Sequence, residues 1–361
     1  MKILQVINNL ATGGAEKLLL ETIPLYREKG IVMDVLVLNG TNYPFLQQLK
    51  DLECCTIYSL GLKSVYNPIH IFKIIPYLKK YDILHVHLFP AQYWVVLAKL
   101  LSFSKTKLFF TEHNITNVRI QNKVFKLLEC FIYCYYHKII CITNEIKIVM
   151  KQHTNSTSDK FVVIENGVNL AAIRASKPYQ KIQIHPSINQ DTILLIQVAG
   201  FREQKDQPTL IKALSHLPIE YKLLLVGDGV LQSDCEKLVQ ELQLSERVLF
   251  LGLRADVPQL LKTADIVVLS SHYEGLSLSS IEGMASGKPF VASKVAGLSE
   301  VVSGVGILFE QGNDKALAQV LENLIDNPDY YLAVAIACQE KANQYDISTM
   351  VDQHIHLYEA I

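Results

Sequence analysis

IVVLSSHYEGLSLSSIEGMASGKP, residues 266–289, contains a complete strand, turn and helix in one short stretch. Its first four residues are apolar without alternation, which is typical of a parallel strand that is buried on both faces. After the turn, apolar residues recur at i, i+3 and i+7, and a glycine and a proline follow at the offsets of a helix C-terminus. The stretch therefore predicts a buried strand at 266–269 and a short helix from Ser277 to Ser286.

Two carboxylates bracket the turn of this unit, because Glu274 precedes the predicted helix and Glu282 lies in its second turn. The first turn of a helix presents unpaired backbone N–H groups and the positive end of the helix dipole, which together bind anions. We expect a diphosphate there, with Glu282 accepting hydrogen bonds from a ribose diol and Glu274 from a hexose. The alternative is that both acids are solvated surface charges around an ordinary strand-helix unit.

Four segments lie close together in this part of the chain: Glu274-Gly275, Glu282 to Ala285, Gly287-Lys288-Pro289, and Gly297 with Glu300 to Val302. Together they resemble the E-x7-E segment of the retaining glycosyltransferases of family 4, which have the GT-B fold. Further segments are similar to positions of the same family and occur in the same order: Gly13 to Glu16, Glu165 to Val168, Leu225 to Gly229, Val248 to Gly252, and Ala264 to Ile266.

The resemblance implies an α/β chain of GT-B type, with two Rossmann-like, doubly wound parallel-sheet domains that face a central cleft. Length agrees, since 361 residues exceed what a single core usually holds. We expect an acceptor-binding domain at 1–175 and a nucleotide-sugar-binding domain at 176–340. The polar segment from Ala175 to Asp191 is the expected hinge, and residues 341–361 are expected to form a helix that returns to the first domain.

A regular alternation of strand and helix patterns supports parallel sheets with right-handed crossovers. The stretch from Asp329 to Ile361 is predicted to be helical. The predicted strands are Ile3–Ile7, Val32–Leu38, Ile83–His87, Lys107–Phe110, Lys138–Cys141 and Phe161–Ile164 in the first half, and Ile193–Val198, Lys222–Val226, Val248–Leu251, Ile266–Leu269, Pro289–Ser293 and Ile307–Phe309 in the second.

The net charge of −1 conceals two halves of opposite sign. Residues 1–178 hold 21 Lys+Arg against 12 Asp+Glu, whereas residues 179–361 hold 13 against 23. A basic first half favours anionic partners, either a membrane surface or a phosphate-bearing acceptor. The run from Arg119 to Lys138 mixes cations with large apolar residues at helical spacing, which is typical of a membrane-interface helix but also of a core helix with one wet face.

The apolar segments and the cysteines of the sequence indicate the cellular location of the protein. No stretch reaches the ~18 uninterrupted apolar residues of a membrane span, and the seven cysteines lack the spacing of a disulfide framework or a metal site. We therefore expect a cytoplasmic protein that associates peripherally with the inner face of the cytoplasmic membrane.

By the resemblance, Lys205 corresponds to the family lysine that neutralises the leaving diphosphate. The family arginine five residues earlier would fall at Gly200, so this cation is missing from its expected place. Arg202 is the candidate that replaces it. His113, just after the predicted strand ending at Phe110, corresponds to the family histidine that meets the donor sugar; the alternative is a histidine satisfied within its own loop.

His85 and His87 share one face of a predicted strand, because alternate residues of a strand point the same way. A metal pair is one explanation, but no third ligand is nearby in sequence. Contact with the acceptor, or simple hydrogen bonding at the strand end, is favoured. Gly13 and Gly14 follow the first strand and allow the backbone to approach a phosphate, although a tight turn without a ligand is the alternative. Their spacing is not that of a dinucleotide-binding oxidoreductase.

The resemblance, together with the basic and apolar first half, implies a retaining transferase that moves a hexose from a nucleotide-sugar to a glycan or polyprenyl-linked acceptor, in cell-surface polysaccharide assembly. No metal or other cofactor and no nucleic acid are expected. A sugar-nucleotide epimerase of the same fold and a noncatalytic glycan- or partner-binding member are the alternatives. The predicted catalytic residues are His113, Arg202, Lys205 and Glu274, and the predicted donor-binding residues are Gly13, Gly14, Gly227, Gly275, Leu276, Ser277 and Glu282.

Overall fold

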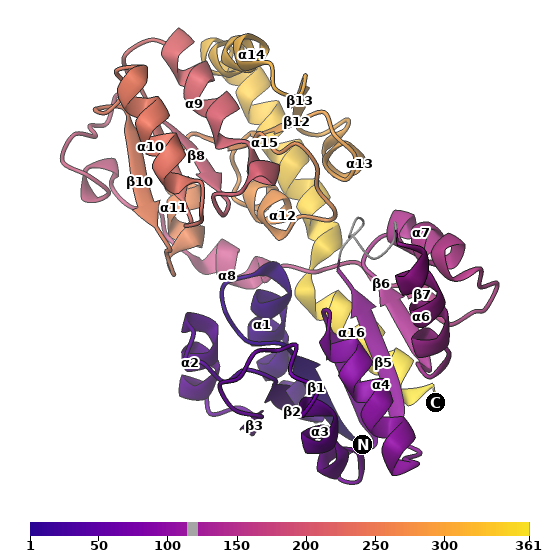
Figure 1. Ribbon diagram of the computed structural model, residues 1–361. Coiled ribbons are helices and arrows are strands. Elements are labelled where there is room, and N and C mark those ends of the chain that lie inside the picture. The colour runs from indigo at the N-terminus through magenta and orange to yellow at the C-terminus, as the bar shows by residue number, and fades with distance from the viewer. Residues whose placement is uncertain (114–121, 361) are drawn as a thin grey trace. The chain divides into compact units, whose positions relative to one another are not determined.

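The computed structural model describes residues 1–113 and 122–360, and it divides the chain into two compact units. The first unit is Met1–Gly167 with Ile347–Ile361, and the second is Val168–Asp346. The divisions at Gly167 and Asp346 replace the expected boundaries at 175 and 340. Each unit has its own parallel sheet flanked by helices (Figure 1), which confirms the predicted fold class.

The sheet of the first unit has seven parallel strands in the order β3-β2-β1-β4-β5-β6-β7. The order reverses between β1 and β4, which is the point where doubly wound sheets bind ligands at the carboxyl ends of their strands. Residues Gln5 and His85 face each other across β1 and β4, and His87 faces Thr111 across β4 and β5. The strands are β1 (Lys2–Ile7), β2 (Val32–Val37), β3 (Ile57–Ser59), β4 (Ile83–His87), β5 (Lys107–Glu112), β6 (Lys138–Cys141) and β7 (Phe161–Val163).

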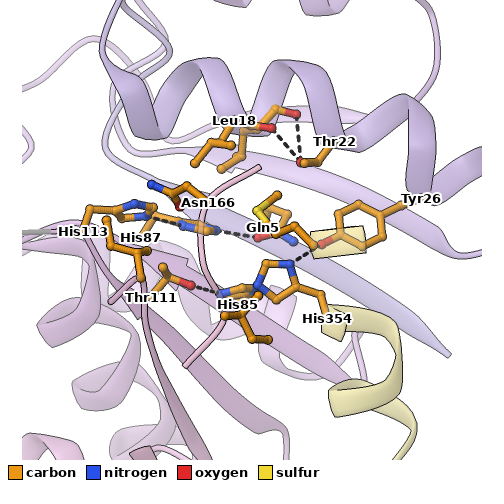
Figure 2. Close-up of a pocket in the computed structure, with 14 residues that line it drawn as sticks. Gln5, Leu18, Thr22, Tyr26, His85, His87, Thr111, His113, Asn166 and His354 are labelled. Atoms are coloured by element: carbon orange, nitrogen blue, oxygen red, sulfur yellow. Dashed lines mark hydrogen bonds between the residues drawn. The ribbon is translucent and has the colours of Figure 1, made fainter. Parts of the chain in front are cut away.

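The helices of the first unit are α1 (Gly14–Glu28), α2 (Pro44–Asp51), α3 (His70–Leu78), α4 (Ala91–Ser102), α6 (Lys123–Cys134), α7 (Asn144–Thr154) and α16 (Ile347–Glu359). The last of them, α16, packs against α1. Two polar contacts are made there: Lys29, directly after α1, places Nζ 2.6 Å from Asp352 Oδ1, and Tyr26 OH in α1 lies 2.9 Å from His354 Nδ1 (Figure 2). The final helix of the chain is therefore part of the first unit.

The sheet of the second unit has six parallel strands in the order β10-β9-β8-β11-β12-β13. The strands are β8 (Ile193–Val198), β9 (Tyr221–Val226), β10 (Val248–Gly252), β11 (Ile266–Leu269), β12 (Phe290–Ser293) and β13 (Ile307–Phe309). The helices are α8 (Leu170–Ala175), α9 (Gln207–His216), α10 (Gln232–Glu241), α11 (Val257–Thr263), α12 (Leu278–Ala285), α13 (Leu298–Val302), α14 (Asp314–Asp326) and α15 (Pro328–Ala342), with short 3-10 turns η1 (Lys181–Gln183), η2 (Glu203–Lys205) and η3 (Asn343–Tyr345).

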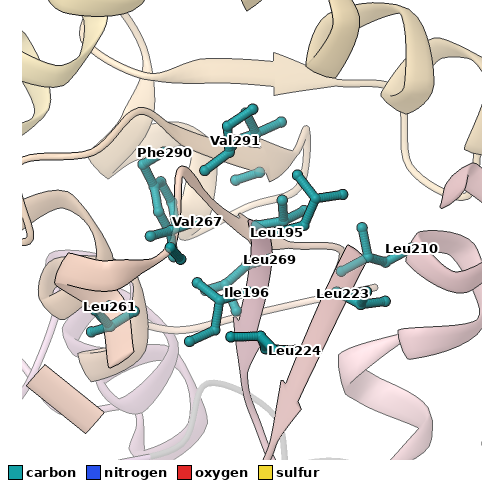
Figure 3. Close-up of a cluster of buried hydrophobic side chains, with 14 of the residues drawn as sticks. Leu195, Ile196, Leu210, Leu223, Leu224, Leu261, Val267, Leu269, Phe290 and Val291 are labelled. Atoms are coloured by element: carbon teal, nitrogen blue, oxygen red, sulfur yellow. The ribbon is translucent and has the colours of Figure 1, made fainter. Parts of the chain in front are cut away.

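The core of this unit lies between the sheet and its helices, and Figure 3 shows a part of it. All four residues of β11 are buried, as an apolar run without alternation predicts. Helix α12 packs directly on the sheet, because an ideal Cβ on Gly283 would lie 2.7 Å from the Phe290 ring and 2.9 Å from Val267. The absent side chain at Gly283 therefore fixes the depth of the helix that carries Glu282.

The observed strands differ from the predicted ones by at most two residues at either end, and β3 is an addition to them. The predicted helical stretch from Asp329 is interrupted at residues 343–346, where η3 separates α15 from α16. Arg119, at the start of the basic and apolar run, lies outside the described residues. Among the described residues, the helices all fall short of the length and apolar content that crossing a bilayer requires.

Candidate active site

The carboxylate of Glu274 is the centre of a polar cluster in the turn between β11 and α12. Glu274 is only 6 % exposed. Its Oε1 atom lies 2.5 Å from Nζ of Lys205 and accepts a hydrogen bond of 2.7 Å from Ser271 Oγ. A buried carboxylate is stable only when it is paired in this way. The structure thus brings together two residues that the sequence proposed separately.

Lys205 is positioned by the carboxyl ends of two neighbouring strands. Gln197, in β8, donates a hydrogen bond of 2.9 Å from Nε2 to the carbonyl oxygen of Lys205. Ser270, directly after β11, donates from Oγ to the carbonyl oxygen of Asp206 at 2.7 Å. Asp206 in turn caps α9 by accepting from the Thr209 amide at 3.3 Å. The ammonium group is therefore held by an ordered turn and not by a free loop.

The amino-terminal end of α12 lies directly after this turn. The carbonyl oxygen of Ser277 accepts hydrogen bonds from the amides of Ser280 and Ile281 at 3.1 and 3.3 Å. Within the described part of the chain, the amides of Leu278 and Ser279 have no acceptor. They supply the donors that an anion at a helix terminus requires.

Glu282 lies one turn further along α12 and is 7 % exposed. Both acids of the predicted site are therefore buried. The alternative of two solvated surface charges is wrong, because neither side chain lies in bulk solvent. Burial of two acids in a single short unit is costly without partners, and it is common at binding sites.

Two glycines allow the backbone of this site to pack closely. Gly297 has φ +80°, and an ideal Cβ there would lie 2.3 Å from the carbonyl oxygen of Glu274. Gly227, after β9, has φ +138°, and its Cβ would lie 2.2 Å from the carbonyl oxygen of Ala199. Glycine alone tolerates both the positive φ and the close approach. Gly297 therefore supports the turn that carries Glu274 and Gly275.

Arg202 lies beside Gly200, the position where the sequence lacks the expected cation. An ideal Cβ on Gly200 would lie 3.7 Å from Nε of Arg202, so the guanidinium stem runs beside the missing side chain. The Arg202 side chain is exposed and has no ion-pair partner among the described residues. The replacement of the expected cation by Arg202 stays a prediction.

In the first unit, three predicted histidines form one row at the carboxyl ends of β4 and β5, joined by one hydrogen bond and one ring stack (Figure 2). His87 Nδ1 lies 3.1 Å from His113 Nε2, and the stacked rings of His85 and His87 have centroids 4.5 Å apart. His85 is bonded through both ring nitrogens, at 2.7 Å to Thr111 Oγ1 and at 2.5 Å to Tyr358 OH. Both ring nitrogens of His85 are therefore occupied, and none is left to contact a glycosyl acceptor. His85 serves as a hydrogen-bonding residue at the strand end.

The tautomers of this row follow from Gln5. Its Nε2 group donates to Met33 Sδ at 3.2 Å, which directs Oε1 to His87 Nε2 at 2.7 Å. His87 must then carry its proton on Nε2 and accept through Nδ1. The proton between the last two rings belongs to His113 Nε2, and His113 Nδ1 is left as a hydrogen-bond acceptor. His87 thus orients His113 through this hydrogen bond.

Burial keeps these rings uncharged. Desolvation lowers the pKa of His113 to about 4 and, helped by the proximity of His113, lowers the pKa of His354 to about 3. Burial and the neighbouring histidines also hold the pKa values of His85 and His87 well below the ordinary range. These rings border a small cavity of about 30 Å³, which is room for one or two water molecules.

The sequence did not point to Gln5, His354 or Tyr358 as members of this cluster. His354 contributes an Nε2 atom that is buried without a hydrogen-bond partner among the described residues. His354 and Tyr358 stand four residues apart on α16, so they share one helix face. That spacing alone is also typical of an ordinary core helix.

The glycine pair lies where the sequence placed it, at the start of α1. Gly13 is the N-cap, and its carbonyl oxygen accepts from the Lys17 amide at 2.9 Å. A Cβ on Gly13 would lie 2.3 Å from Glu16 Oε2. Among the described residues, no three His, Cys, Asp or Glu side chains are arranged to hold a metal ion, so the pair His85 and His87 has no third ligand there.

The sequence matches two family descriptions that together span most of the chain. Residues 12–172 match "Glycosyltransferase Family 4", and residues 179–342 match "Glycosyl transferases group 1". The chain is a family 4 glycosyltransferase. The predicted family and the predicted transferase activity are confirmed.

The similarity to known proteins covers both units of this glycosyltransferase. The putative glycosyltransferase EpsD of Bacillus subtilis is 26 % identical over 302 residues, 78 % of this chain and 77 % of that protein. The UDP-Gal:alpha-D-GlcNAc-diphosphoundecaprenol alpha-1,3-galactosyltransferase of Escherichia coli is 27 % identical over 315 residues, 82 % and 80 % of the two chains. The crystal structure of Anabaena HepE in complex with UDP and glucose superposes with a TM-score of 0.87 at 22 % identity, over 100 % of both chains. The superposition shows a shared GT-B architecture.

Proposed function

We propose that this glycosyltransferase moves a hexose from a nucleotide-sugar to a hydroxyl group of a glycan or lipid-linked acceptor, with retention of the anomeric configuration. The observation that carries the proposal is the buried pair of Lys205 and Glu274 beside the amides of α12. It combines a cation, a carboxylate and unpaired N–H donors at one helix terminus. A diphosphate joined to a sugar needs that combination.

The proposed roles follow from where charge develops. When the bond between the anomeric carbon and the diphosphate oxygen breaks, negative charge grows on the diphosphate and positive charge on the sugar ring. Lys205, Arg202 and the amides of Leu278 and Ser279 would stabilise the leaving diphosphate. Glu274 would hold sugar hydroxyl groups, and Glu282 would hold the ribose diol.

Without an enzyme nucleophile, retention requires that the acceptor attacks from the face that the diphosphate leaves. The acceptor oxygen forms the new bond to the anomeric carbon, and its proton passes to an oxygen of the departing diphosphate. Glu274 is a poor candidate for nucleophile or base, because Lys205 and Ser271 already bind its Oε1 atom. His113, neutral and with an accepting Nδ1, would receive a hydrogen bond from a sugar hydroxyl.

Metal independence belongs to the same proposal, because the cations and amides of the second unit supply the charge that a bound Mg²⁺ would otherwise provide. Excess EDTA should leave the transfer rate within a factor of about two. A loss of activity that Mg²⁺ restores would contradict this part.

The relatives and the charge of the first half support the class of donor and acceptor. The Escherichia coli relative is named for UDP-Gal and a diphosphoundecaprenol acceptor, and the Anabaena structure holds UDP and glucose. The first 178 residues carry an excess of nine positive charges. We propose a UDP-hexose donor, an anionic lipid-linked acceptor, and action at the cytoplasmic face of the membrane.

The test is incubation with a panel of sugar nucleotides, with and without lipid-linked acceptors, while free nucleoside diphosphate is measured. Release that needs the acceptor, with a product whose anomeric configuration by NMR matches that of the donor, is the expected result. Rearranged or hydrolysed donor without acceptor would identify an epimerase. Donor binding without turnover on any acceptor would identify a noncatalytic member.

A further inference from the structure

An apolar groove opens between α4 and α6 of the first unit, apart from the histidine row. Its volume is about 350 Å³, at the lower end of the range of small-molecule sites. Two helices and two loops form its walls. Among the lining residues are Phe89, Trp94, Leu97, Phe125, Leu128 and Phe131.

The aromatic residues of α4 turn their polar atoms away from this groove. Trp94 donates from Nε1 to the carbonyl oxygen of Val65 at 2.8 Å, and Tyr93 donates from OH to Glu129 Oε1 at 2.9 Å. The surface that these two residues leave to an occupant is therefore carbon. A sugar or nucleotide placed there would lose hydrogen bonds to water and regain few, which excludes these ligands. The occupant must be a hydrocarbon.

The outer wall of the groove continues into an exposed apolar face. On α6, Val124 is 73 % exposed and Leu127 is 75 % exposed, and the lining residue Leu128 is 40 % exposed. Large apolar side chains gathered on one helix mark a contact with another molecule or with a membrane. Lys126 lies between them in sequence, as on helices that rest on anionic lipid.

The inner end of the groove reaches the carboxyl edge of the sheet. Phe89 lines the groove and follows His87, the last residue of β4, by two positions. Its carbonyl oxygen accepts from Asn8 Nδ2 at 2.7 Å, which ties it to the loop after β1. A molecule in the groove would thus lie between the loop that follows β4 and the exposed face of α6.

We propose that this groove binds the hydrocarbon chain of a phosphate-bearing lipid whose polar head is the acceptor. The inference rests on the proposed function and assigns a site to the acceptor's lipid part. A phosphate head fits the charge of the first unit, which has 19 Lys+Arg against 14 Asp+Glu, a net charge of +5. A hydrocarbon chain needs only carbon around it, and the groove runs from the exposed apolar face of α6 to the loop that follows β4.

The protein carries its own reporter for this site, since Trp94 is the one tryptophan in the sequence. Bromine atoms quench tryptophan fluorescence on contact. Dodecyl phosphate brominated in mid-chain, kept below its micelle concentration, should quench Trp94 saturably, whereas unbrominated dodecyl phosphate and inorganic phosphate should not. Absence of saturable quenching by the brominated compound would overturn the proposal.

Two variants of α6 separate the groove from the surface around it. Leu128→Asp places a carboxylate in the lining and should weaken binding of the brominated probe about tenfold or more. Leu127→Asp adds the same charge to the same helix outside the lining and should change binding less than about twofold. Equal effects of both variants would identify adsorption to the exposed face. A change from dimer to monomer in Leu128→Asp by ultracentrifugation would instead identify a second copy as the occupant; either result refutes a lipid site.

Activity assays separate failure of this inference from failure of the proposed function. Leu128→Asp should lose transfer to a lipid-linked acceptor while still binding UDP with unchanged affinity. Unchanged transfer to the lipid-linked acceptor would refute the groove and leave the transferase function intact. Saturable quenching in a protein that transfers no sugar would refute the proposed function alone.

Discussion

Replacing Lys205 with methionine tests both the stability and the charge of the donor site. The side chains of Lys205 and Glu274 are 17 % and 5 % exposed, so removal of the ammonium leaves a buried carboxylate with weaker partners. Exposed ion pairs contribute about 0 to 1 kcal/mol, and removing one partner of a fully buried pair costs about 3 to 5 kcal/mol. For this partly buried pair we expect a loss of about 2 to 3 kcal/mol in unfolding free energy.

The effect on catalysis should be larger than the effect on binding. Loss of one donor to a developing oxyanion typically lowers the rate by about 10² to 10³. Urea unfolding measures the first effect, and release of nucleoside diphosphate in the presence of acceptor measures the second. Adding Glu274→Gln to the lysine variant removes the unpaired carboxylate and should restore most of the stability while activity stays low.

A matched control lies in the same unit. Lys181 Nζ is 2.8 Å from Asp265 Oδ2, and the lysine side chain is 17 % exposed, as in Lys205. Lys181→Met should lower stability less than Lys205→Met, because its partner Asp265 is 22 % exposed, and should leave the transfer rate within a factor of about two. A Lys205→Met protein with wild-type turnover, or a control that loses activity equally, would refute the charge argument.

Further predictions concern the ribose, the turn and the histidine row. Glu282→Ala should weaken UDP binding about tenfold in calorimetry, since a ribose diol loses its acceptor; an unchanged dissociation constant would remove this role. Gly297→Ala should lower the urea midpoint, because its Cβ would meet the carbonyl oxygen of Glu274. Burial depresses the pKa of His113 to about 4, below the ~6.5 of a histidine in an unfolded chain. The contribution of this residue to the unfolding free energy should therefore be complete above about pH 6.5 and should decrease as the pH falls toward 4. An unfolding free energy that does not change over this range would contradict the assignment. Nitrogen-15 shifts should show the proton of His113 on Nε2, and Gln5→Leu should disturb that tautomer.

Local patterns predicted most of the fold. The apolar run of β11 and the helical spacing after it placed the strand and α12 within a residue or two, because burial on both faces leaves a clear signal. Strand β3 has only three residues at the edge of its sheet, and none of them is fully buried. Neither run length nor alternation marks such a strand.

Single candidate residues could be named from the sequence, and their contacts could not. Glu274 and Lys205 were each named from sequence, but their ion pair depends on the adjacency of β8 and β11 in the sheet. The members of the histidine cluster are farther apart still, since His85 and Tyr358 are separated by 273 positions. Only the packing of α16 on the first unit brings them together.

The central claim is that the donor diphosphate binds at the amino-terminal end of α12 beside Lys205. A crystal structure with UDP bound measures this most directly. The account predicts phosphate oxygens about 3 Å from the amides of Leu278 and Ser279 and from Nζ of Lys205, with Glu282 on the ribose hydroxyls. Density for UDP at any other place, with these groups unchanged, would contradict it.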